Sequence, residues 1–210
     1  MEIRKPLLQT RLLKELENLE KEPVLRTEKA VLKNKSFDNL ELEELKVSES
    51  EMENISFSGA TIEESLVIDS KLSKIDLSGA VLTNTSIERT ELHNSRIQGT
   101  QFVEADLKDV LIKNSKGTHS SFRFCKLKNV IFIDCNLNEV DFQHASLENI
   151  LFQNCDLREA IFVSSTLKNV DIRTSNIENL KINKEAIVRI ITDSSQALYF
   201  SSLFGIIVEN

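Results

Sequence analysis

An apolar residue falls at every fifth position of this chain, without a slip from Phe122 to Ile172. The same register extends back to Leu32 and forward to Ile182. A period of five fits neither the α-helix, with about 3.6 residues per turn, nor the β-strand, which alternates every two residues. The repeat is therefore a unit that stacks on its own copies, as in a solenoid. The unbroken stretch contains Phe122, Leu127, Phe132, Leu137, Phe142, Leu147, Phe152, Leu157, Phe162, Leu167 and Ile172.

Residues twenty apart provide a second pattern. If each pentad forms one short side and a corner, four pentads close a square coil, and residues twenty apart lie above one another. Phenylalanines gather in one such column, while Asn and Gly gather at two corners, where tight turns favour positive φ. The column is Leu82, Phe102, Phe122, Phe142, Phe162 and Ile182; the corners are Asn34, Asn54, Asn94, Asn114, Asp134 and Asn154, then Gly59, Gly79 and Gly99.

These pentads resemble the unit of the pentapeptide-repeat family, loosely A(D/N)LXX. The resemblance is carried by Ala105-Asp106-Leu107, Ala145-Ser146-Leu147 and Cys155-Asp156-Leu157, and it covers residues 28–183. It implies an all-β solenoid, a right-handed quadrilateral β-helix of about eight coils. Many units carry Val, Ile or Cys where Ala is usual, but these residues still point inward.

Each end of a stack of coils exposes apolar side chains and unpaired strand edges, which a terminal element must cover. Residues 6–20 carry leucines on one stripe, typical of an amphipathic helix. We therefore expect three parts: an N-terminal helical cap over 1–27, the β-helix over 28–183, and a C-terminal helix and strand cap over 184–210.

The C-terminal tail is the most apolar part of the chain. We expect a short helix over 184–192, then a second helix over Gln196–Phe204 with one of the two preceding serines as N-cap and Gly205 as its stop. A short strand over 206–208 completes the expected tail. Its apolar side chains either cap the last coil or form a homodimer, and both alternatives stay open. The candidate dimer segment is Leu198, Tyr199, Phe200, Leu203 and Phe204.

Composition fits one elongated soluble domain, with 40% hydrophobic and 28% charged residues in 210. No apolar run approaches the roughly 20 residues of a membrane span. The N-terminus lacks the apolar core of a secretory signal, so we expect a cytoplasmic protein without membrane contact. Cys125, Cys135 and Cys155 occupy inward positions, as expected for buried thiols in a reducing compartment.

Charge is banded along the chain. Residues 28–70 hold eleven acidic and four basic side chains, whereas residues 108–130 hold six basic side chains and one acidic. Within the acidic band, five glutamates lie outward or at a corner on neighbouring coils, and they form the candidate acidic interaction surface. These are Glu41, Glu43, Glu44, Glu63 and Glu64.

Residues that carry chemistry do not converge. His93, His119 and His144 fall on different sides of the square, and no metal-ligand spacing, phosphate loop or nucleophile motif appears. We expect no catalytic, metal or cofactor site, so the protein is predicted not to be an enzyme. Gly117 stands where an aliphatic residue belongs; it marks either a ligand notch or a defect that neighbouring side chains fill, and packing density favours the second.

Two functions remain. The first is a non-enzymatic scaffold whose charged faces bind another protein, which the sequence does not identify. The second comes from the resemblance, which implies DNA mimicry, because some pentapeptide-repeat proteins bind DNA gyrase or topoisomerase IV and protect them from quinolones. The basic band interrupts the negative charge that a mimic needs, so the scaffold ranks first. Direct nucleic-acid binding is disfavoured by the net charge of −7 and by the expected lack of exposed aromatic side chains.

Overall fold

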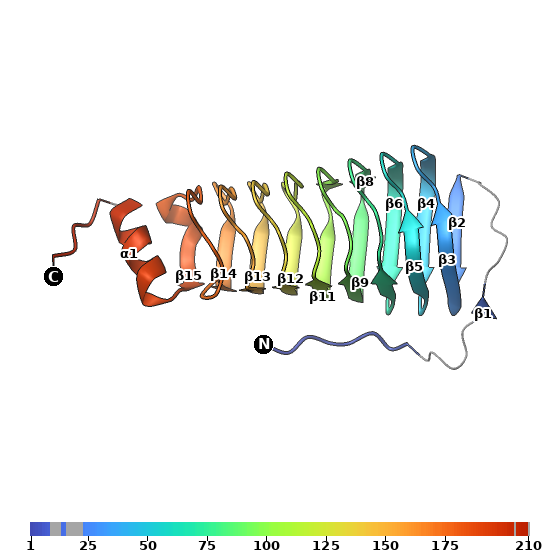
Figure 1. Ribbon diagram of the computed structural model, residues 1–210, viewed down its shortest axis with the longest axis horizontal. Coiled ribbons are helices and arrows are strands. Elements are labelled where there is room, and N and C mark those ends of the chain that lie inside the picture. Colours follow the sequence, from blue (N-terminus) through green and yellow to red (C-terminus); the bar gives the residue numbers. More distant parts are fainter. Residues whose placement is uncertain (9–13, 16–22, 204, 210) are drawn as a thin grey trace.

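The computed structural model describes residues 1–8, 14–15, 23–203 and 205–209. The chain forms a rod-shaped β-solenoid of about eight turns, with helix α1 (Ser194–Leu203) at one end (Figure 1). Within these residues, no helix has the length and hydrophobicity to cross a bilayer.

Through the repeats, strands stack along the rod with an offset of twenty residues. Leu107 of one coil pairs with Leu127 of the next, which in turn pairs with Leu147, and every strand pair is parallel. The strands are β1 (Lys14–Glu15), β2 (Val24–Glu28), β3 (Ala30–Ser36), β4 (Glu41–Ser48), β5 (Glu51–Ser56), β6 (Thr61–Ile68), β7 (Lys71–Ser73), β8 (Val81–Thr83), β9 (Thr85–His93), β10 (Gln101–Val103), β11 (Asp106–Lys113), β12 (Lys126–Ile133), β13 (Ser146–Gln153), β14 (Thr166–Asp171) and β15 (Ile187–Ile191). The twenty-residue register predicted from the sequence is therefore confirmed.

The phenylalanine column forms a continuous stack through the core. Ring centroids lie 4.6 Å apart between Phe102 and Phe122, 5.2 Å between Phe122 and Phe142, and 5.0 Å between Phe142 and Phe162, with nearly parallel planes. All four side chains are buried. The inward position of each pentad is thus the one that the apolar period predicts.

The corners carry the backbone conformation expected of Asn and Gly. Asn34 and Asn54 have φ of 54° and 56°, and Gly59 has φ of 65°. Side-chain amides at the asparagine corner also bond from coil to coil, as from Asn54 to Asn34 at 2.8 Å and from Asn154 to Asp134 at 3.3 Å. Stacked corners therefore stabilise the register from outside as the apolar columns do from inside.

The break at Gly117 is filled. A Cβ atom at this position would lie 2.9 Å from Cδ2 of Leu137 and 3.1 Å from Cγ1 of Ile97, both of them buried side chains. Neighbouring coils thus occupy the missing volume, and the structure contains no ligand notch at Gly117.

The three cysteines are buried and free, as expected. Burial raises the pKa of the Cys125 thiol to about 11. The pKa of Cys155 is raised by its hydrogen bond with Cys135 on the preceding coil and by burial. The Cys125 and Cys155 thiols are therefore protonated at neutral pH, which suppresses their reactivity, whereas the hydrogen bond with Cys155 lowers the pKa of Cys135.

The helix predicted over residues 6–20 is wrong wherever the structure describes that segment. Residues 6–8 have no regular structure, and Lys14–Glu15 form β1, which pairs with β3. At Lys14–Glu15, main-chain pairing with β3 covers part of the exposed edge of the first coil. The rest of the predicted helix, 9–13 and 16–20, lies outside the described residues.

Two predictions for the C-terminal tail are also wrong. A 3-10 helix over Lys184–Ala186 and strand β15 replace the helix predicted over 184–192, because β15 extends the sheet from the free edge of β14. Residues 206–208 do not form a strand. The second helix is present as α1, and Gly205 follows it with φ of 74°, as predicted for its stop.

The N-cap of α1 is Asp193, one residue before the two serines considered from the sequence. Its carboxylate accepts the backbone N–H of Gln196 at 2.9 Å, while the backbone N–H of Asp193 donates to Oε1 of Gln196 at 3.2 Å. This reciprocal pair is a capping box. The side-chain nitrogen Nε2 of Gln196 also donates to the backbone carbonyls of Ile172 and Ser175 in the last coil, at 2.8 and 2.9 Å. Gln196 therefore fastens α1 to the end of the rod.

Candidate interaction surfaces

The structure gathers all five predicted glutamates around one open hollow of about 750 Å³ near the N-terminal end of the rod. They project from the paired strands β4 and β6, where Glu44 lies beside Glu64 in register. We keep the name acidic surface for Glu41, Glu43, Glu44, Glu63 and Glu64. The hollow is also lined by Pro23, Val24, Arg26, Leu42 and Thr61.

The backbone beneath the acidic surface differs from the expected geometry. Glu44 and Glu64 were predicted at a corner, but β4 and β6 run straight through both positions, and neither residue has a positive φ. The acidic side chains therefore stand on two continuous, neighbouring strands of the sheet.

Only part of this negative charge is neutralised within the molecule. Arg26 donates from Nε to Oε1 of Glu44 at 3.1 Å and forms a second, shorter bond to the other oxygen. These hydrogen bonds lower the pKa of Glu44. Among the described residues, no ion pair reaches the other four glutamates, so their charge is available to a partner.

The acidic surface ends after two coils. One coil beyond Glu63, the equivalent position holds Thr83, and the next holds Val103. The basic band then follows, in which Lys108 pairs with Glu88 at 3.2 Å and Lys128 pairs with Glu148 at 3.4 Å. Negative charge is thus densest on the first coils, is interrupted by the basic band, and resumes over residues 131–183, which hold eight acidic and four basic side chains.

An exposed aromatic corner was missed from the sequence. Phe124 is 59% exposed, has φ of 61°, and stacks on His144 with ring centroids 4.9 Å apart. The guanidinium of Arg123 lies 5.8 Å from the ring centre of Phe124. The expectation that aromatic side chains are absent from the surface is therefore wrong. The signal was the second phenylalanine in Ser121-Phe122-Arg123-Phe124, which stands at a corner position.

The histidines occupy separate places, as predicted. His93 lies 3.1 Å from a carboxylate oxygen of Glu91, and His119 lies 3.5 Å from Glu139 at another corner. No group of three potential metal ligands occurs within the described part of the chain.

The candidate dimer segment divides between core and surface. Phe200 is buried and Tyr199 packs against the core, whereas Leu198 and Leu203 are about half exposed. Phe204 lies outside the described residues. Beyond α1, the side chains of Ile206, Ile207 and Val208 are exposed. The free end of the rod therefore presents an apolar surface after α1 has packed against the last coil.

Comparison with known proteins agrees with this architecture. The family model described as "Pentapeptide repeats (8 copies)" matches residues 68–111, and the model "Pentapeptide repeat region" matches residues 118–182. No curated protein sequence matches the chain.

A solved structure of low sequence identity shares the fold. A trypsin-treated variant of QnrB1, described as a plasmid-mediated fluoroquinolone resistance protein, is 18% identical; the match covers 93% of this chain and 96% of that one, with a TM-score of 0.50. HetL, a pentapeptide repeat protein from the cyanobacterium Nostoc sp. strain PCC 7120, is 14% identical over 75% of this chain and 84% of its own, with a TM-score of 0.30. By its repeats and by these models, the chain belongs to the pentapeptide-repeat family.

Proposed function

We propose that this protein is a non-enzymatic scaffold that binds another protein through the acidic surface. The observation that carries the proposal is the gathering of five glutamates in one hollow, four of them without an ion pair among the described residues. A partner with a basic patch would supply the missing counter-charges, and such complementarity favours both the rate and the specificity of association.

The outer walls support binding better than catalysis. A catalytic carboxylate needs a site that excludes water, where preorganised groups act in a low dielectric. Glu41, Glu43 and Glu63 are instead exposed in an open hollow. Their geometry suits electrostatic recognition of a protein surface.

DNA mimicry, directed at DNA gyrase or topoisomerase IV, is the second candidate. It is favoured by the net charge of −7 and by a fold shared with QnrB1, a fluoroquinolone resistance protein. It is disfavoured by the extent of the acidic surface, because duplex DNA carries one charge per roughly 1.7 Å along its axis. Two coils with a strand spacing of about 4.8 Å supply only a short acidic segment.

We expect a variant with Glu43, Glu44, Glu63 and Glu64 changed to Gln to lose partner binding while keeping its fold. The measurement is affinity capture from host cytosol with wild type as bait, repeated at increasing salt, since contacts between exposed charges are screened. A matched variant with Glu104, Glu139, Glu159 and Glu178 changed to Gln has the same net charge and keeps the acidic surface. Equal capture by both variants would contradict the proposal.

The same two variants separate the candidates in a gyrase supercoiling assay with and without a quinolone. Inhibition or protection at micromolar wild type, lost only in the variant of the acidic surface, would establish DNA mimicry. Capture of a partner without any effect on gyrase or topoisomerase IV leaves the scaffold.

We further propose that the tail forms a symmetric homodimer through the exposed side chains of Leu198 and Leu203. Pairing buries an apolar surface that α1 leaves uncovered. Sedimentation at micromolar concentration should show a dimer for wild type and a monomer for Leu198→Asp combined with Leu203→Asp. Both positions are half exposed, so the change spares the packing of Phe200 against the core. If the wild-type protein sedimented only as a monomer, the dimer proposal would be wrong and the tail would serve only to cap the last coil.

A further inference from the structure

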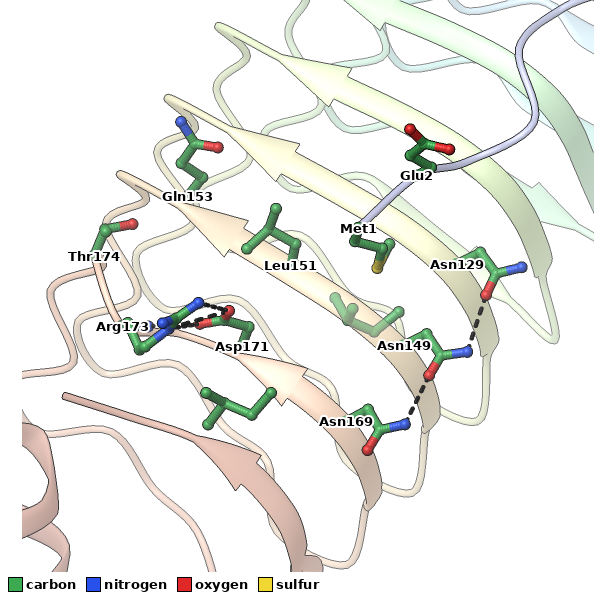
Figure 2. Close-up of a pocket in the computed structure, with 12 residues that line it drawn as sticks. Met1, Glu2, Asn129, Asn149, Leu151, Gln153, Asn169, Asp171, Arg173 and Thr174 are labelled. Carbon is green, nitrogen blue, oxygen red and sulfur yellow. Dashed lines mark hydrogen bonds and ion pairs between the residues drawn. The ribbon is translucent and has the colours of Figure 1, made fainter.

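Residues 1–8 form an extended segment, the N-terminal arm, which runs back along one edge of the rod (Figure 1). Two backbone N–H groups of the arm reach carboxylates on the rod. Leu7 donates to Oδ1 of Asp69 at 3.0 Å, and Arg4 donates to Oδ1 of Asp109 at 3.5 Å. Met1 and Glu2 then lie at a hollow lined by the next coils (Figure 2).

The arm follows one corner of the solenoid, where polar side chains bond from coil to coil. Asn129 donates to Asp109 at 3.1 Å. Asn149 donates to Asn129 at 3.1 Å and Asn169 to Asn149 at 3.0 Å (Figure 2). We call these four residues, with Asp69, the polar ladder. Its oxygen atoms lie along the rod axis, and the row is interrupted by Arg89, which lies between Asp69 and Asp109 and donates to both oxygens of Asp69 at 2.8 and 2.7 Å.

Asp109 holds unused acceptor capacity. Its side chain is only 3% exposed, and its Oδ2 atom has no hydrogen-bond partner in the described part of the protein. An unpaired buried acceptor loses its hydration without compensation, so buried carboxylate oxygens are rarely left without a donor. The position is therefore built to accept a further donor from a chain lying over the corner.

The spacing of the ladder matches an extended chain. Asp69 and Asp109 lie two coils apart, about 10 Å at the usual strand separation of about 4.8 Å. Arg4 and Leu7 are three residues apart, which also spans about 10 Å in an extended chain. A further step of the same size leads from Asp109 to Asn149, which lines the hollow together with Met1.

The wall beside the ladder is apolar on its outer face. Leu111, Ile131 and Leu151 project outward on successive coils, and Ile131 is nevertheless only 8% exposed. The hollow at its end, about 760 Å³, is lined by Met1, Leu151 and Asp171. The pKa of Asp171 is lowered mainly by hydrogen bonds from Arg173, and the α-ammonium group of Met1 contributes in the same direction.

We propose that the polar ladder and this apolar wall form a binding track for an extended peptide with a free amino terminus, and that the N-terminal arm occupies the track until a partner peptide displaces it. The track is separate from the acidic surface and does not depend on its role. The arm suits a displaceable occupant because few main-chain hydrogen bonds hold it, and Met1 and Leu7 remain 53% and 68% exposed.

The experiment measures binding of the synthetic peptide Met-Glu-Ile-Arg-Lys-Pro-Leu-Leu, labelled at its carboxyl end, by fluorescence anisotropy. The full-length double variant Arg4→Pro, Leu7→Pro lacks both N–H donors of its own arm. A tethered arm competes at an effective concentration in the millimolar range. The double variant should therefore bind the peptide at least about tenfold more tightly than wild type. Lys5→Pro is the control, because no hydrogen bond is found for that N–H among the described residues.

A second pair of changes tests the track itself in the double variant. Asp109→Gly removes the ladder carboxylate, and glycine tolerates the φ of 55° at that corner. Asp134→Gly is the matched control at another corner, where Asp134 likewise accepts from the asparagine twenty residues on. Binding should fall at least fivefold with Asp109→Gly, stay unchanged with Asp134→Gly, and weaken when the peptide is acetylated. Equal affinity of wild type and double variant, equal effects of the two glycines, or no binding up to 1 mM peptide would overturn the proposal.

Discussion

Phe142→Ala should lower the free energy of unfolding by about 3–5 kcal/mol, the usual range for removing a fully buried phenyl group. Phe142 is 0% exposed, stacks on Phe122 and Phe162, and meets the edge of Phe152 with ring centroids 6.0 Å apart. Strand pairing between coils holds the neighbouring side chains in place, so they can fill only part of the cavity that the substitution leaves. Equilibrium unfolding in urea provides the measurement.

Phe124→Ala is the matched control for this prediction. It deletes the same atoms from a side chain that is 59% exposed, so the loss should stay within about 0.5 kcal/mol. Phe124→Gly should be neutral or stabilising, because glycine relieves the strain of a bulky residue at φ of 61°. A loss below about 1 kcal/mol for Phe142→Ala would show that the phenylalanine column does not form the core.

Gln196→Glu should release α1 from the end of the rod at neutral pH. The introduced carboxylate keeps the acceptor of the capping box, but it loses the N–H₂ group and faces the carbonyls of Ile172 and Ser175. An uncompensated buried charge costs about 3–5 kcal/mol. Hydrogen exchange of the α1 amides should therefore become fast in this variant while the central coils stay protected.

The effect of Gln196→Glu should depend on pH with a defined sign. The folded state disfavours the charged form, so the pKa of the introduced carboxyl lies above its unfolded value. The Gln196→Glu variant is therefore closest to wild type in stability below the unfolded pKa of this carboxyl. The variant loses stability as pH rises through the folded pKa of the same group. Gln196→Leu, which has no titratable group, should show a deficit that does not change with pH. A pH-independent deficit in both variants would contradict the buried contact of Gln196.

The repeat region was predictable because its information is repeated. Every coil has apolar residues at the same inward positions. The column through Phe122 and the corners at Asn94 and Asn114 indicate the same twenty-residue period independently. Stacking on an identical neighbour leaves few alternatives, so a local pattern is enough to define long-range pairing.

The ends were less predictable, because no neighbouring copy constrains them. Lys14 and Glu15 lie within a sequence that has a helical apolar stripe, yet these two residues pair as a strand with the free edge of β3. The same competition replaced a helix with β15. Main-chain hydrogen bonds offered by an open sheet edge outweigh the intrinsic preference of a short segment.

The interaction surfaces were predictable only in part. Charge counting located the acidic surface, but the pairing of Glu44 with Arg26 depends on strand β2, which precedes the recognised repeats. Phe124 was overlooked because its pentad already has an inward phenylalanine. The track beneath the N-terminal arm joins residues more than one hundred positions apart, which no local pattern reveals.

The square coil gives changes of chain length an unusual consequence. Insertion of a single pentad would keep every later inward residue inward, because apolar, buried side chains recur at every fifth position. It would also rotate all later walls by a quarter of a coil. Residues after the insertion would then lie on the neighbouring face of the rod instead of the face that they shared with residues before it. Insertion of a full coil would lengthen the rod and restore each face. Insertions and deletions of pentads can therefore rearrange the outer surface of such a protein during evolution while its core packing stays nearly unchanged.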